Sequence, residues 1–336
     1  MVVVSSERTK EYLRLGRLFN AEILSVIFIL SYVLAAHLYN ASIDGVTLVG
    51  LFIMGILTHI WGCYNNDRLD LSIDKQTTYC SHKPLVSGSI SIKTAKIIEN
   101  LALFFIFGIA IYLSPKVTTP LYLFGLIALA YLYNRLNKSN MLINIVGQMY
   151  ACFAVLVGMS IIVDFDFILF LSAIVMGLNG VYLNIIEADL KDVEGDIINV
   201  PKSLGLKFKG GKAVNKIKFY ILNEGVKMVM FALILWILFL EFNNIISDTM
   251  LLTILVACIL FVVNWGIRYQ MFKHLSPDRE QMKKHIALQE LSAVFLISTI
   301  FIVIHPLIPI FLVIFITLWL AVWNKILWGT YFRPQV

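Results

Sequence analysis

Long apolar stretches alternate with short polar segments along most of the chain. A transmembrane helix needs about 20 predominantly apolar residues to cross a bilayer. Only His305-Pro306 and the nearby Pro309 separate the last two stretches, which form either a hairpin of two helices or one broken helix; we favour the hairpin. The pattern predicts nine or ten transmembrane helices, near residues 18–37, 47–64, 97–113, 119–134, 142–163, 167–186, 219–240, 250–267, 286–305 and 307–328.

The composition agrees with a membrane protein. Hydrophobic residues make up 59% of the chain and charged residues 14%, and the mean hydropathy is +0.84. Soluble domains have roughly 25% charged residues. No soluble domain, Gly/Ser-rich linker or low-complexity tract interrupts the apolar stretches. We therefore expect an all-α, polytopic membrane helical bundle that forms one integral-membrane domain over residues 1–336 and lies in a lipid bilayer.

Lysine and arginine residues gather on one side of this predicted bundle. When the ten stretches are laid out alternately, the segments on one side hold 25 of the 27 Lys and Arg residues. Because cytoplasmic loops collect these residues, we expect the N-terminus and the long loops to be cytoplasmic. The net charge of +6 then reflects membrane orientation. No nucleic-acid partner is expected, since the charge is dispersed among short loops.

Two of the polar segments carry matching sets of three aspartates. Spacings of three and then four residues place three carboxylates on one face of a helix. Such a patch repels itself unless cations compensate it, and hard divalent cations prefer oxygen ligands. Solvated helix ends are the alternative, but two matching sets on the same side favour a metal-bridged anion such as a diphosphate. The sets lie 122 positions apart: Asp67, Asp70 and Asp74, then Asp189, Asp192 and Asp196.

The residues around both sets resemble a known family. "NDRLDLSID", residues 66–74, resembles the NDxxDxxxD motif of the UbiA superfamily of intramembrane prenyltransferases, and "DLKDVEGD", residues 189–196, resembles its second aspartate motif. "KPLVSG" at 83–88 is similar to the RPLxSG that follows the first motif. "RLFN" at 17–20 resembles the RPxN before the first long helix, and "YNRLNK" at 133–138 resembles a basic loop of the family.

The resemblance extends from about residue 14 to residue 300 and shows departures from the family pattern. Lys83 stands where Arg is usual, Leu18 and Phe19 replace a Pro-containing pair, and Asn199 stands where Gly is common. The resemblance implies a bundle that encloses a hydrophobic tunnel, with the motif loops forming a cap over its cytoplasmic mouth. It further implies transfer of a prenyl group from an isoprenoid diphosphate to a lipophilic acceptor, with two Mg²⁺ ions.

The resemblance also assigns roles to individual residues. The six aspartates are implied to be the catalytic, metal-binding residues. For the basic residues implied to bind substrate, the alternative role is to set the membrane orientation of the chain. For the asparagine at position 20, the alternative is a hydrogen bond between two helices. The residues implied to contact the substrate are Asn20, Asn66, Lys83, Arg135 and Lys138.

Other readings of the sequence stay open at this stage. A secondary transporter also has about ten helices and intramembrane acids, although its coupling sites lie near the midplane. A UbiA-type terpene cyclase ionises the same diphosphate without an acceptor. For a transferase, similar motifs serve aromatic acids of quinone synthesis, the geranylgeranylglyceryl phosphate of ether lipids, tetrapyrroles and carotenoids, and we favour a lipid or quinone precursor. Among polar residues at membrane depth, Glu22 and Gln148 are candidate acceptor contacts, and Glu224 and Lys227 are predicted to pair with each other.

Overall fold

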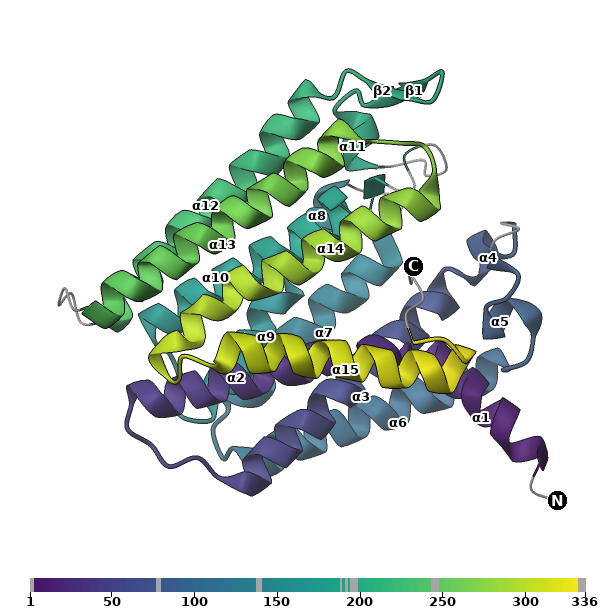
Figure 1. Ribbon diagram of the computed structural model, residues 1–336. Helices are drawn as coiled ribbons and strands as arrows, with labels where there is room; N and C mark the ends of the chain where they lie inside the picture. Colours follow the sequence, from purple (N-terminus) through teal and green to yellow (C-terminus); the bar gives the residue numbers. More distant parts are fainter. Residues whose placement is uncertain are drawn as a thin grey trace. The chain divides into compact units, whose positions relative to one another are not determined.

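The computed structural model describes residues 3–76, 80–136, 141–187, 189–190, 193, 199–242 and 248–331. These residues are mostly helical (Figure 1). In chain order the elements are α1 (Val3–Leu15), the short helix η1 (Leu18–Asn20), α2 (Glu22–Leu38), α3 (Gly45–Leu69), α4 (Leu71–Asp74), α5 (Pro84–Ser87), α6 (Ile92–Leu113), α7 (Thr118–Leu136), α8 (Met141–Gly147), α9 (Tyr150–Ser160), α10 (Phe167–Val181), η3 (Tyr182–Glu187), α11 (Val200–Ser203), β1 (Lys207–Lys209), β2 (Lys212–Val214), α12 (Ile217–Glu241), α13 (Asp248–Lys273), α14 (Arg279–Ser298), η5 (Thr299–Val303) and α15 (Ile308–Trp328).

The predicted all-α membrane architecture is confirmed. Within the described residues, eight helices are long and apolar enough to cross a membrane, and the apolar helix at 145–160 is shorter. The predicted stretch at 119–134 corresponds to α7. At the end of the chain, η5 ends at Val303 and α15 begins at Ile308, so this region contains two helices. The prediction of nine or ten helices is therefore approximate.

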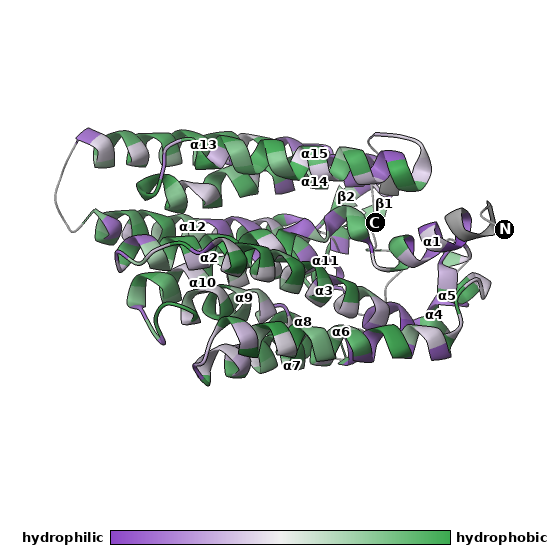
Figure 2. Cartoon of the chain, turned by 90° about the horizontal axis from the view of Figure 1, so that it is seen from below, coloured by the Kyte–Doolittle hydropathy of each residue, from purple (hydrophilic) through white to green (hydrophobic). Residues whose placement is uncertain are grey.

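Apolar side chains cover the outer faces of the long helices. Hydrophobic residues run along these helices, whereas hydrophilic residues gather mainly toward their ends (Figure 2). Large exposed apolar residues on the spans include Phe104, Ile111, Val262 and Phe311. Exposure on this scale would be unfavourable in water but suits contact with lipid tails.

The chain divides into two compact units. The first unit comprises residues 1–136, 153–165 and 316–333, and the second comprises residues 137–152, 166–315 and 334–336. The prediction of one domain over residues 1–336 stays a prediction.

In the first unit, small residues let helices approach closely. Ser25 on α2 lies against Gly55 on α3, and its hydroxyl donates to the carbonyl oxygen of Phe52 at 2.7 Å. Gly158 on α9 lies against Phe28 and Ser31 on α2. Small residues at helix contacts are typical of membrane bundles, where close backbone packing replaces the hydrophobic effect as the source of helix association.

We expect Gly158→Ala to destabilise the first unit. The added Cβ would lie 2.0 Å from Ser31 Oγ and 2.3 Å from the backbone oxygen of Phe28, which cannot move without shifting α2. Overpacking of this kind costs about 1–3 kcal/mol. The measurement is the melting temperature in detergent, with Gly108→Ala on α6 as the control because nothing lies within 4 Å of its added Cβ. Equal melting temperatures for the two variants would contradict the close contact.

In the second unit, an apolar cluster supports the second aspartate motif. α10 continues into the π-helical turn η3, after which Leu190 and Val193 are buried in the same cluster as Tyr182 and Phe219. β1 and β2 form a short antiparallel hairpin with Lys207 opposite Val214, which the all-α prediction did not include. Its turn uses Gly210 and Gly211, both at positive φ, as two-residue hairpins require.

The second unit also contains a buried polar network. The guanidinium of Arg268, fully buried on α13, donates to both carboxylate oxygens of Glu224 on α12, at 3.0 and 2.8 Å, and also to Asn264. The predicted pairing of Glu224 with Lys227 is therefore wrong, because Glu224 forms its ion pair with Arg268. The ammonium of Lys227 instead lies 3.5 Å from the centre of the Tyr182 ring. Arg268, which the topology count treated as loop charge, is thus a buried structural residue.

Candidate functional site

The first aspartate set lies where α3 ends. α3 runs from Gly45 to Leu69, and Asp44 caps its start by accepting from the backbone N–H of Thr47. Asp70 links α3 to the short helix α4, which ends at Asp74. All three aspartates of the set are buried, with 8% or less of each residue exposed. Like charges at this burial are unfavourable without compensation, so their partners decide how the set is stabilised.

Two basic side chains compensate the first set. The guanidinium of Arg17 donates to Asp67 Oδ1 at 3.0 Å. The ammonium of Lys83 lies 3.3 Å from the same oxygen and 2.7 Å from Asp74 Oδ2. Because Lys83 reaches both carboxylates, Asp67 and Asp74 lie on the same side, as their spacing predicts. Arg17 and Lys83 thus compensate the buried charges of Asp67 and Asp74.

The environment keeps both basic groups charged. The Asp67 carboxylate raises the pKa of Arg17 well above its ordinary value, and burial opposes this only in part. Burial lowers the pKa of Lys83, but Asp67 and Asp74 together raise it by more, so the net shift is upward. Both side chains are therefore cations at neutral pH.

The "KPLVSG" segment places Lys83 beside the aspartates. Lys83 precedes Pro84, the first residue of α5, and its extended backbone is what a residue before proline favours. Gly88 ends α5 in the left-handed conformation with φ 79°. Leu85 and Ile90 anchor the segment in an apolar cluster formed by residues of α1, α3, α4 and α6.

A polar network behind the aspartates joins α3, α6 and α7. Arg68 donates to both oxygens of Glu99, at 2.7 and 3.0 Å, and Asn65 donates to Glu99 at 3.3 Å. Asn134 donates to Asn65 at 3.1 Å and accepts from Asn66 at 3.3 Å. Asn66, which the sequence predicted beside the metal ligands, therefore also fixes α3 against α7. Arg68, like Arg268, was counted among the basic residues of the predicted cytoplasmic loops, but it forms an ion pair between two helices.

Of the second aspartate set, the structure describes Asp189. Its carboxylate accepts from the backbone N–H of Val200 at 3.2 Å, and its backbone oxygen accepts from the Asn199 side chain at 2.8 Å. Asn199 also caps α11 by accepting from the N–H of Lys202. Asn199 appeared in the sequence only as a departure from the family pattern, yet it holds Asp189 in place. Asp192, Asp196 and Lys138 lie outside the described residues.

The two other predicted substrate residues make no contact with the aspartates of the first set. Asn20 is half-buried at the end of η1, and in the described part of the chain its side chain makes no hydrogen bond. Arg135 is exposed near the end of α7 and interacts with the Tyr131 hydroxyl at 3.3 Å. Their substrate-binding roles stay predictions. Arg17, in contrast, was not predicted as a site residue; its place at the head of "RLFN" was the available signal.

The first set has oxygens that suit a divalent cation. Arg17 and Lys83 use Oδ1 of Asp67, and Lys83 uses Oδ2 of Asp74, so one oxygen of each carboxylate accepts no hydrogen bond from the described residues. Within the described ranges, no three His, Cys, Asp or Glu side chains could hold a metal by themselves. Mg²⁺ sites commonly combine one or two carboxylates with phosphate oxygens, so the residues fit that ion.

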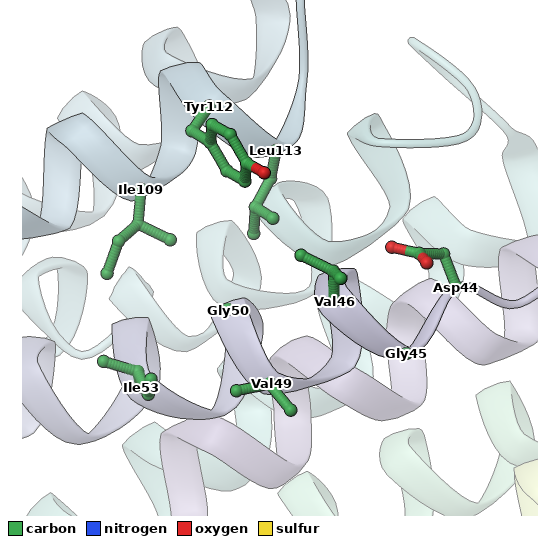
Figure 3. Close-up of a pocket in the computed structure, with 9 residues that line it drawn as sticks. All are labelled: Asp44, Gly45, Val46, Val49, Gly50, Ile53, Ile109, Tyr112 and Leu113. Carbon is green, nitrogen blue, oxygen red and sulfur yellow. The ribbon is translucent and has the colours of Figure 1, made fainter.

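An apolar groove lies between the start of α3 and the end of α6, at the far end of α3 from the aspartates. It has a volume of about 620 Å³ and is lined by residues that include Val46, Val49, Ile109 and Tyr112, with Asp44 at one end (Figure 3). Asp44 and Asp67 are 23 residues apart, or about 35 Å along a helix. The groove is therefore remote from the aspartates and is not part of the candidate site.

Comparison with known sequences identifies one family. A sequence model of the UbiA prenyltransferase family matches residues 24–285, which include both aspartate motifs. No curated protein matches the chain significantly.

Solved structures with similar folds cover most of the chain. A structure of digeranylgeranylglyceryl phosphate synthase is 20% identical, with a TM-score of 0.58, and the match covers 88% of this chain and 98% of that one. The apo structure of a UbiA homolog from Aeropyrum pernix K1 is 14% identical, with a TM-score of 0.61 and coverage of 83% and 97%. A UbiA homolog from Archaeoglobus fulgidus bound to GPP and Mg²⁺ is 16% identical, with a TM-score of 0.53 and coverage of 88% and 99%. At these identities the similarity establishes the fold.

Proposed function

Because this chain belongs to the UbiA prenyltransferase family, we propose that it moves a prenyl group from an isoprenoid diphosphate to a lipophilic acceptor in lipid or quinone biosynthesis. Its family and its long apolar helices make it a multi-pass integral membrane prenyltransferase. The observation that carries the proposal for the site is the bridge from Lys83 to Asp67 and Asp74 at the end of α3.

Charged and apolar side chains of the protein suit the two parts of such a donor, the diphosphate head and the prenyl tail. A diphosphate is a polar anion, and its prenyl tail is apolar, so the head belongs at a helix end and the tail among apolar side chains. Arg17 and Lys83 offset the aspartates that would otherwise repel the anion, and their N–H groups are of the kind that recognise phosphate oxygens. Apolar surroundings also exclude water, which would otherwise hydrolyse the ionised prenyl group.

The two aspartate sets are proposed to hold two Mg²⁺ ions in contact with the diphosphate. When bound, Mg²⁺ neutralises the negative charge that develops on the leaving diphosphate. In the first set, Asp67 and Asp74 each offer the oxygen that their basic partners do not use. In the second set, Asn199 and the backbone of Val200 fix the orientation of Asp189. The residues proposed as ligands are Asp67, Asp70, Asp74, Asp189, Asp192 and Asp196.

Geranylgeranylglyceryl phosphate is the first acceptor to test. Support comes from the digeranylgeranylglyceryl phosphate synthase among the similar folds, and the aromatic acids of quinone synthesis come second. The experiment uses the full chain in nanodiscs with radiolabelled geranylgeranyl diphosphate and Mg²⁺, with each acceptor in turn and with none. A labelled product that needs an acceptor supports transfer. A cyclic hydrocarbon formed without an acceptor would indicate a terpene cyclase, and no product with or without any acceptor would reopen the transporter hypothesis.

We expect both motif loops on the cytoplasmic side of the membrane. The reason is the excess of Lys and Arg on that side, which persists after Arg68 and Arg268 are assigned to ion pairs with Glu99 and Glu224. Topology reporters inserted at residues 80 and 205 should read cytoplasmic, and reporters at 42 and 245 should read external. Opposite readings at 80 and 205 would separate the two aspartate sets and defeat the proposed site.

A further inference from the structure

The turn before α2 has an unusual backbone at Arg17. Arg17 adopts φ 44° and ψ 47°, in the left-handed region. A residue with a side chain is disfavoured there by roughly 1–2 kcal/mol, so such a conformation persists only where surrounding contacts impose it. The turn carries the guanidinium that donates to Asp67, so the contacts that impose this conformation also place that charge.

Two side-chain N–H groups hold the backbone immediately after the Cα of Arg17. His59 Nε2 on α3 lies 3.2 Å from the carbonyl oxygen of Arg17, which can only accept, so this nitrogen carries the proton. The indole N–H of Trp319 on α15 donates to the carbonyl oxygen of Leu18 at 2.9 Å. The rings of Phe19 and Trp328 also meet edge-on, with centroids 5.1 Å apart.

These contacts come from separate parts of the chain. His59 lies on the helix that carries Asp67, two turns earlier, whereas α15 lies wholly beyond the family match, which ends at residue 285. α15 reaches α1 as well, because Arg14 donates to the carbonyl oxygen of Leu327 at 2.6 Å. A helix outside the family match therefore fixes the residues next to the first aspartate motif.

We propose that Trp319 and His59 are positioning residues that hold Arg17 on Asp67 Oδ1 and thereby keep the other Asp67 oxygen available to Mg²⁺. This inference rests on the proposed function, because it concerns the same metal-binding set. Neither residue touches the reacting atoms. Loss of either contact frees the turn, and the Arg17 guanidinium can then reach either oxygen of Asp67 and compete with the metal.

The test uses the full chain in nanodiscs with the variant Trp319→Phe, which keeps an aromatic ring and removes the N–H donor. The first readout is the Mg²⁺ concentration that gives half of the maximal rise in melting temperature in the presence of inorganic diphosphate. We expect this concentration to increase about 5- to 10-fold, as for the loss of one hydrogen bond. The second readout, hydrogen exchange of residues 16–21 without metal, should show faster exchange. His59→Ala should act in the same direction, and His59→Gln, which can donate to the Arg17 carbonyl, should restore part of the affinity.

Two further variants distinguish a positioning role of Trp319 from a general effect on the stability of the protein. Trp323→Phe, one turn further along α15, keeps an aromatic ring beside Trp319 and removes an indole N–H that makes no hydrogen bond within the described residues, so both readouts should stay unchanged. In an Arg17→Ala background, Trp319→Phe should no longer change the Mg²⁺ midpoint, since coupled residues are not additive. Equal midpoints for Trp319→Phe and the unmodified chain, or an unchanged effect in the Arg17→Ala background, would overturn the proposal. Neither readout requires turnover, so a chain without prenyl transfer would refute the proposed function and still decide this inference.

Discussion

Asp67→Asn and Asp189→Asn are each expected to reduce prenyl transfer by roughly three orders of magnitude or more. Each change removes a charged oxygen ligand from one of the two proposed metal sites. Metal-ion stabilisation of a leaving group is worth several kcal/mol, and about 4 kcal/mol corresponds to roughly 10³-fold in rate. The measurement is transfer of labelled prenyl diphosphate in nanodiscs with excess Mg²⁺, and excess EDTA should likewise abolish activity in the unmodified chain. An active Asp67→Asn variant, or full activity in EDTA, would refute metal-dependent catalysis at these sets.

The two variants are expected to differ in stability. From charge repulsion alone, loss of one aspartate should relieve the set and leave the melting temperature unchanged. The structure changes this expectation for Asp67, because Arg17 and Lys83 both donate to Oδ1 and would then face a neutral amide. Asp189 accepts a backbone N–H, and an asparagine oxygen can also accept it. We therefore expect the lower melting temperature for Asp67→Asn, with Asp164→Asn, on an exposed carboxylate, as the control.

Lys83→Ala is expected to weaken the affinity for the prenyl diphosphate and to strengthen the affinity for Mg²⁺. The diphosphate would lose a charged hydrogen-bond donor worth about 1.5–3 kcal/mol, which raises KM for the donor roughly 10- to 150-fold. The remaining carboxylates would have lost one of two compensating cations, so the Mg²⁺ concentration needed for half-maximal activity should fall. Both values come from steady-state kinetics in which donor and Mg²⁺ are varied independently.

Lys75→Ala provides the matched control, because Lys75 is exposed just after α4 and makes no ion pair among the described residues. If both constants of Lys83→Ala rose together, Lys83 would act by holding the fold of the site. If neither changed, Lys83 would serve only to set the topology.

The helices could be predicted from the sequence because each span is a continuous apolar stretch of bilayer length. Their close contacts could not, since Gly55 and Gly158 look the same in the sequence as Gly108, which faces open space. The β1–β2 hairpin was missed because its strands have only three residues each. The interruption at His305-Pro306 did predict the start of a new helix, because proline breaks the backbone hydrogen-bond ladder.

The candidate site was predictable in its residue types but not in its partners. Spacing alone placed Asp67 and Asp74 on one side, and Lys83 was expected near them. Its actual role as a bridge between two carboxylates depends on how α5 packs, which no local pattern reveals. Arg17 looked like one of several basic residues before the first span, because its partner Asp67 lies 50 positions away. Asn199 was counted as a departure from the family pattern although it orients Asp189.

The partly buried pair of Arg68 and Glu99 affects how the chain is inserted into the membrane. Glu99 follows Arg68 by 31 residues, so at about 5–20 residues per second the ribosome adds it roughly 2–6 s later. Until then α3 carries an arginine without its partner, and such a side chain extends toward the membrane surface to stay hydrated. We expect α3 to settle at its final depth only when α6 arrives. The two helices would then leave the translocon as a pair, and Asn134 would lock α7 onto them afterwards.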